Sequence, residues 1–85
     1  MRRQKVYVGV DVFHYPDGRF QLRSLTFRNG VTYIIDRVRQ SCHTASVEVN
    51  GSGIRHTIVI RGEETYLFDE GNGRWFVEAK VGGED

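Results

Sequence analysis

Apolar and polar residues alternate with a period of two along most of this chain, and no stretch shows a convincing helical period of 3.6 residues. The first run is the clearest, with valines at positions 6, 8, 10 and 12 separated by Tyr7, Gly9 and Asp11. Such alternation is typical of a strand that buries one of its two faces. The pattern therefore predicts a first strand near residues 4–15.

A turn signal, Pro16-Asp17-Gly18, ends this strand, because proline presets φ and glycine accepts a positive φ. A second strand is predicted over about 19–28. Its apolar parity slips between Leu22 and Leu25. A β-bulge near Arg23-Ser24 explains the slip, since one extra residue turns all following side chains to the other face.

Asn29-Gly30 is the strongest local signal in the chain. Between two β-rich runs this dipeptide favours a two-residue type I′ hairpin, because both central residues need φ > 0. The expected register sets Arg28 opposite Val31, Thr26 opposite Tyr33 and Leu25 opposite Ile34. One face then carries Leu25, Phe27 and Ile34, and the other carries Arg28, Tyr33, Ile35, Arg37 and Arg39.

Four further strands are expected in the second half of the chain. A short one, Val47-Glu48-Val49, precedes a loop at 50–53, and a strong one covers 54–61. Gly62-Glu63 suits a type II′ turn into the next strand, with the cross-strand pairs Arg61–Glu64, Arg55–Glu70 and His56–Asp69. The last strand covers 74–81 after the loop Gly71-Asn72-Gly73, and residues 82–85 are expected to fray.

The C-terminal strands carry apolar residues on both faces. In the expected registers one face holds Val59, Tyr66, Phe68, Trp75, Val77 and Ala79, and the other holds Ile58, Ile60, Leu67 and Phe76. A free sheet is apolar on one face only, so this sheet either curls into a barrel or packs against another chain. The second interpretation makes Ile58, Ile60, Leu67 and Phe76 a protein interface, of a homodimer or with a docked partner.

Length and composition narrow the class of protein. A chain of 85 residues holds one small domain, with an ordered core expected over about 5–81. One cysteine excludes an internal disulfide, and no apolar run is long enough for a membrane span. The predicted fold is all-β: a small, strongly bent antiparallel meander, or SH3-like partial barrel, of six or seven strands. We expect a cytoplasmic protein without cofactor and without a membrane partner.

Charge is distributed unevenly along the chain. Residues 1–42 contain eight Arg and Lys against three Asp, a net charge of +5, whereas residues 43–85 contain four against eight acidic residues, a net charge of −4. The two halves either neutralise each other in the fold or leave separate charged surfaces for partners.

Arg28, Tyr33, Arg37 and Arg39 form the candidate binding site, because the expected hairpin register gathers them on one face. Arginine neutralises phosphate and an aromatic ring offers a stacking surface, as in single-strand nucleic-acid binding by small barrels. The predicted function is a non-enzymatic binding module for nucleic acid or an acidic protein. The alternative interpretation of these residues is a solvated strand face.

No catalytic residue and no metal ligand is predicted. His56 and Asp69 are expected to pair across a hairpin, but nothing in the sequence places a nucleophile beside them. Cys42-His43 lacks the spacing of a metal site, and the glycine-rich loops lack the helix that a phosphate loop requires.

Two segments resemble a known family. Residues 27–38, which read FRNGVTYIIDRV, resemble the F-R-x-G-x-x-Y-x-V-x-x-V run of a small uncharacterised β-domain. That domain occurs at the C-terminus of Y-family-polymerase-like mutagenesis proteins in bacteria and as stand-alone short proteins. Residues 67–78 are similar to its closing hairpin, although the further tryptophans expected in the middle of the domain are missing and only Trp75 is present. The resemblance implies a bacterial protein with a DNA-linked or protein-docking role, and it transfers no catalytic residue.

Overall fold

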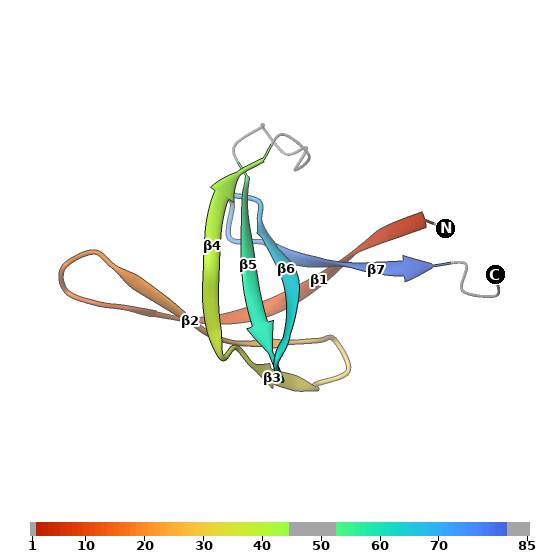
Figure 1. Ribbon diagram of the computed structural model, residues 1–85, viewed down its shortest axis with the longest axis horizontal. Coiled ribbons are helices and arrows are strands. Elements are labelled where there is room, and N and C mark those ends of the chain that lie inside the picture. The colour runs from red at the N-terminus through yellow and green to blue at the C-terminus, as the bar shows by residue number, and fades with distance from the viewer. Residues whose placement is uncertain (1, 45–52, 82–85) are drawn as a thin grey trace.

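The computed structural model describes residues 2–44 and 53–81, which form one antiparallel sheet of seven strands. The strands are β1 (Arg2–His14), β2 (Phe20–Thr26), β3 (Thr32–Ile34), β4 (Arg37–His43), β5 (Ile54–Ile60), β6 (Glu63–Asp69) and β7 (Trp75–Val81). Their order across the sheet is β3-β2-β1-β7-β6-β5-β4. Figure 1 shows β4, β5 and β6 crossing β1 and β7, so the sheet curls into a half-barrel. The predicted all-β partial barrel is confirmed.

Some sequence predictions fall on residues that the structure does not describe. The expected strand at 47–49, most of the loop at 50–53 and the expected frayed tail at 82–85 lie outside the described residues. Within the described ranges there is no helix, and therefore none long and apolar enough to cross a membrane.

β1 is long because it pairs with two neighbouring strands. Its residues 2–8 pair with β7, and its residues 9–14 pair with β2. Asp11 lies opposite Ser24 and Val12 lies opposite Leu22, so Arg23 is an extra residue in β2. The bulge predicted near Arg23-Ser24 is confirmed, and it turns both Leu22 and Leu25 into the core.

The register predicted for the first hairpin is wrong by one residue. Thr26 lies opposite Thr32, and Leu25 lies opposite Tyr33. Phe27 N–H donates to the Val31 carbonyl at 2.9 Å, which leaves a three-residue loop with Gly30 at φ +89° in place of the two-residue type I′ turn.

Burial explains the register of this hairpin. The observed register turns both Tyr33 and Ile35 toward the core, whereas the type I′ register would have turned only Ile34 toward it. Ile34 is 64% exposed, in contrast to the buried Ile35.

The second hairpin also differs from the prediction. Ile60 lies opposite Glu63, so the turn consists of Arg61 and Gly62, both with positive φ (+53° and +79°). This is the backbone pattern of a type I′ turn, in place of the predicted type II′ turn at 62–63. The three predicted pairs Arg61–Glu64, Arg55–Glu70 and His56–Asp69 are therefore wrong.

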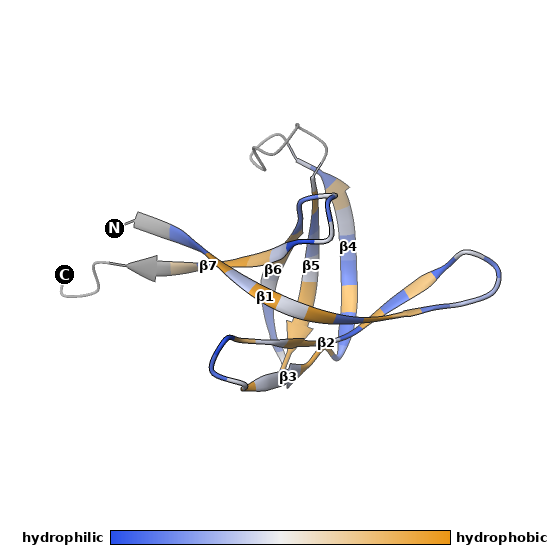
Figure 2. Cartoon of the chain, turned by 180° about the vertical axis from the view of Figure 1, so that it is seen from behind, coloured by the Kyte–Doolittle hydropathy of each residue, from blue (hydrophilic) through white to orange (hydrophobic). Residues whose placement is uncertain are grey.

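The main core fills the inside of the curled sheet. It consists of buried side chains from β1, β2, β5 and β6 together with one from the bend before β4: Val8, Leu22, Leu25, Ile35, Ile58 and Leu67. Figure 2 shows the alternating apolar and polar bands, clearest along β4 and the β1–β2 hairpin, that allow strands to bury one face. The predicted curling of a sheet with two apolar faces is thus observed.

A smaller cluster covers the outer face of the sheet. Phe68 and Phe76 stack with ring centroids 4.8 Å apart, and Tyr7 packs against them. The Tyr7 hydroxyl donates to the buried carboxylate of Glu70 at 2.7 Å, and this bond, followed by burial, raises the pKa of Tyr7. Lys5 lies 4.9 Å from the Phe76 ring centroid and 3.6 Å from the same carboxylate. Polar side chains therefore close this second apolar face within the chain.

Candidate binding cleft

The sheet splits between β6 and β7. The two strands pair only at Phe68–Phe76 and Asp69–Trp75, after which β7 follows β1. The amide of Glu70 donates to the Arg74 carbonyl, so even-numbered residues of β6 direct their main-chain groups toward β7. By this alternation Glu64 and Tyr66 present main-chain N–H and C=O groups to the split.

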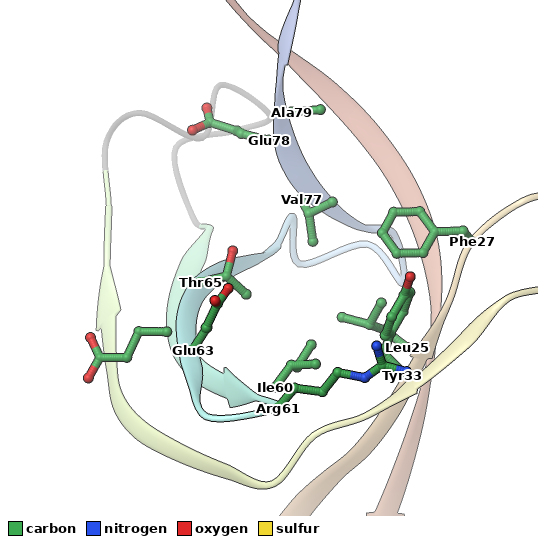
Figure 3. Close-up of a pocket in the computed structure, with 11 residues that line it drawn as sticks. Leu25, Phe27, Tyr33, Ile60, Arg61, Glu63, Thr65, Val77, Glu78 and Ala79 are labelled. Carbon is green, nitrogen blue, oxygen red and sulfur yellow. The ribbon is translucent and has the colours of Figure 1, made fainter.

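The split opens into a cavity of about 640 Å³ inside the half-barrel. Its floor is apolar. It consists of side chains from β2, the β2–β3 loop, β3, β5 and β7: Leu25, Phe27, Tyr33, Ile60, Val77 and Ala79. Figure 3 shows these side chains around one open space, with β7 on one side and the β5–β6 hairpin on the other. We call this cavity and its rim the cleft.

The rim of the cleft is acidic. Glu63, Glu64 and Glu78 line it, and Arg61 is the one cation among the described lining residues. Arg61 reaches from the β5–β6 turn to the Tyr33 ring, 5.4 Å from its centroid, and Figure 3 shows it crossing one end of the cleft. Arg39 pairs with Glu64 at 3.0 Å, whereas among the described residues Glu63 and Glu78 have no ion-pair partner. The cleft thus combines an apolar floor with negative charge.

The structure separates the four residues of the predicted nucleic-acid site. Tyr33 lines the cleft on the core side of β3, and Arg28 lies in the exposed β2–β3 turn. Arg37 and Arg39 are exposed on β4, at the opposite edge of the sheet from β3. The chain bends at Ile35-Asp36, so residues 31–39 do not form one strand face. The predicted arginine–tyrosine surface rested on a register that the structure does not have.

The four residues of the predicted protein interface are also redistributed. Ile58 and Leu67 are fully buried in the main core, and Ile60 lines the cleft. Phe76 lies on the outer face, because it pairs across the sheet with Phe68 and stacks on its ring. Three of these residues share a face as predicted, but that face is the inside of the half-barrel and not an open surface.

His56 has a different partner from the one predicted. It lies opposite Leu67 on β6 and opposite Ser41 on β4, whose hydroxyl is 2.6 Å from its Nδ1. The ring stacks on Trp75. Burial lowers the pKa of His56, and the charge of Asp69 opposes that effect. The expected pair with Asp69 is wrong, because Asp69 lies opposite Ile54 and accepts a hydrogen bond from Gly71.

The other candidate side chains considered from the sequence, Cys42 and His43, form no metal site with the described residues. Cys42 accepts a weak hydrogen bond from Arg55 Nη2 at 3.7 Å, and His43 lies exposed at the end of β4. Within residues 2–44 and 53–81, no three side chains of His, Cys, Asp or Glu gather in a way that could hold a metal ion.

No protein-family model, no curated protein and no solved structure matches this chain. The family resemblance noted from residues 27–38 and 67–78 stays a prediction. Any functional interpretation therefore depends on the geometry of the chain itself.

Sequence reasoning missed the cleft. Two of its glutamates stand in an ordinary hairpin and the third in the last strand, and its apolar residues follow ordinary strand alternation. Only the acidic character of residues 43–85 pointed to it, because Glu63, Glu64 and Glu78 belong to that half. The divergence of β7 from β6 has no local signature, since the course of β7 is set by its pairing with β1.

Proposed function

We propose that this chain is a non-enzymatic binding module whose cleft holds an extended segment of a partner protein. One observation carries the proposal: an apolar cavity with an acidic rim coincides with a strand edge that β7 leaves unpaired. Exposed strand edges pair readily with extended peptides, and an adjacent pocket provides specificity.

The geometry also specifies the kind of segment. A strand added to β6 turns alternate side chains to opposite faces. Those facing inward meet Leu25, Ile60 and Val77, so they should be apolar. Those facing outward pass near Glu64 and Glu78, so they should be basic. The partner is therefore a segment in which apolar and basic residues alternate.

This proposal gives the partner the opposite charge to the one predicted from the sequence. The predicted surface of Arg28, Tyr33, Arg37 and Arg39 is basic and would bind nucleic acid or an acidic protein. Tyr33 now belongs to an acidic cleft. An acidic segment would meet Glu63 and Glu78 there, and like charges oppose association.

Titration calorimetry with a capped peptide of alternating valine and lysine tests the proposal. The valine–glutamate peptide serves as the control, and only the valine–lysine peptide should bind. Glu78→Lys should weaken its binding about fivefold, the equivalent of about 1 kcal/mol for an exposed charge pair. Asp11→Lys makes the same charge change on an exposed β1 residue away from the cleft and should leave affinity within about twofold.

Strand addition has a separate signature. N-methyl groups on one alternating set of peptide amides remove the hydrogen bonds to β6, whereas the other set points away from it. One methylated peptide should therefore lose binding and the other should retain it. Equal binding of both methylated peptides, or of the two charge variants of the peptide, would contradict the proposal.

A further inference from the structure

The β1–β2 hairpin projects from the half-barrel as an arm, residues 11–23, on the side away from the start of β1 and the end of β7 (Figure 1). Along most of the arm the two strands pair only with each other. Val12 and Leu22 pack in the core, but the other side chains of this two-stranded ribbon have no second layer that could cover them, and such a ribbon is marginal as an isolated structure. Whatever the arm displays is therefore displayed to solvent or to a partner.

The arm displays aromatic rings. Phe13 is 43% exposed, Tyr15 is 37% exposed and Phe20 is 50% exposed. Three large rings within eight residues form a concentration of exposed apolar surface, and such surface commonly marks an interaction site. The rings occur on both faces of the ribbon, because Phe13 lies opposite Gln21 while His14 lies opposite Phe20.

Arginines accompany the rings on the first face. The Arg19 guanidinium carbon lies 5.1 Å from the Tyr15 ring centroid, and that of Arg23 lies 5.6 Å from the Phe13 centroid. The two rings are in edge contact at 4.9 Å. Asp17 pairs with Arg19, but among the described residues Arg23 has no ion-pair partner. The face thus alternates cations with stacking surfaces.

The second face borders a groove. A cavity of about 360 Å³ lies between the start of β2 and β4, and Phe20, Arg37, Ser41 and His56 are among its lining residues. Phe20 lies 6.4 Å from the His56 ring, centroid to centroid. Arg37 is exposed and, within the described ranges, unpaired, while the buried Nε2 of His56 has no hydrogen-bond partner. An exposed ring, a free cation and an unsatisfied polar atom therefore occur around one groove.

We propose that the arm and this groove form a second binding site, for single-stranded nucleic acid. Bases would stack on Phe20 and Phe13, and Arg23 and Arg37 would neutralise phosphates. Stacking on aromatic side chains combined with arginine contacts to the backbone is the chemistry by which proteins hold unpaired nucleotides. A duplex keeps its bases stacked inside, so its bases cannot reach the rings. The site does not depend on the cleft, since the two share no lining residue.

Fluorescence anisotropy with a labelled oligothymidine of about twelve nucleotides tests the site, at about 50 mM and about 200 mM salt. Binding should weaken steeply with salt, and the matching duplex should bind less tightly. Phe20→Ala should weaken binding about tenfold, the order of one stacking contact. Arg37→Gln should reduce the salt slope by about 0.7, as expected for one phosphate contact in a single strand.

Arg28→Gln is the matched control, because Arg28 is exposed in the β2–β3 turn and does not line the groove. It should change affinity less than twofold. Circular dichroism of each variant shows whether it folds, and Phe13→Ala provides a second stacking test if Phe20→Ala does not fold.

Several results would overturn this second site: no binding at the lower salt concentration, equal losses for Arg28→Gln and Arg37→Gln, or no loss for the ring variants. Polyglutamate that competes as well as the oligonucleotide would assign the arm to an acidic protein instead.

Discussion

The cleft and the arm belong to the same sheet but offer opposite chemistry. The cleft is concave, apolar at its floor and acidic at its rim, and it includes main-chain groups that β7 leaves unpaired. The arm is a projecting ribbon whose strands pair with each other, so it offers only side chains, chiefly rings and arginines. A site made from backbone leaves little trace in a sequence, whereas a site made from side chains can be recognised there once its strand register is known.

The charge asymmetry of the sequence reappears in this comparison. The basic half supplies Arg19, Arg23 and Arg37 to the arm and its groove, and the acidic half supplies the glutamates of the cleft. The halves also neutralise each other in part, through the pairs Arg39–Glu64 and Lys5–Glu70. These pairs correspond to the first alternative raised by the sequence, and the two proposed sites correspond to the second, which stays a prediction.

The largest expected effect comes from Leu67→Asp, which breaks the core that supports both regions. Leu67 is fully buried, so a carboxylate there has no partner and the chain should not fold, at a cost of more than about 4 kcal/mol. Urea denaturation, monitored by circular dichroism, measures this loss of stability. Ile34→Asp is the control, because Ile34 is 64% exposed and its change should stay within about 0.5 kcal/mol. A folded, monomeric Leu67→Asp protein would return this residue to the interface predicted from the sequence.

Tyr33→Ala distinguishes the cleft from the surface first predicted for this residue. The substitution removes a half-buried ring that packs on Phe27 and under Arg61, so we expect about 2 kcal/mol of destabilisation. Binding of the valine–lysine peptide should be lost, and oligonucleotide affinity should change less than twofold. A selective loss of oligonucleotide binding would instead support the original arginine–tyrosine surface.

Gly62→Ala tests the turn that sets the edge of the cleft. Gly62 has a φ of +79°, which alanine adopts only with strain, so we expect about 1 kcal/mol of destabilisation and a Tm lower by about 4–8 °C. Gly9→Ala is the matched control. Gly9 has no positive φ, and an added Cβ would meet its nearest atom, the Thr26 carbonyl oxygen, at 3.9 Å. Its Tm should not fall, and equal losses for the two variants would contradict the type I′ turn.

The smallest expected effect is a change of stability with pH, caused by His56 in the groove beside the arm. Burial depresses the pKa of His56 below its ordinary value of 6.5, so the unfolded chain binds a proton that the folded chain does not. Stability should therefore be constant above about pH 6.5 and decrease as the pH falls below it. Urea titrations at a series of pH values measure this, and His56→Gln should reduce the slope. A stability that increases on acidification in this range would contradict the assigned burial.

Local features of the sequence predicted much of the fold. The turns at 16–18 and 71–73 and the bulge at Arg23 occur where expected, because proline, glycine and a slip in parity act within a few residues. Registers were less predictable. Asn29-Gly30 is compatible with a two-residue or a three-residue loop, and the choice depends on whether Tyr33 and Ile35 or Ile34 enters a core built by distant strands.

The sequence by itself determined a small all-β fold with one face of most strands apolar, a bulged second strand and a division into a basic and an acidic half. Only the tertiary structure decided which side chains meet. It placed Tyr33 beside Arg61, Ser41 beside His56, and a split between β6 and β7. The reason is that backbone preferences extend over a few residues, whereas register and strand divergence are settled by burial between strands far apart in the chain.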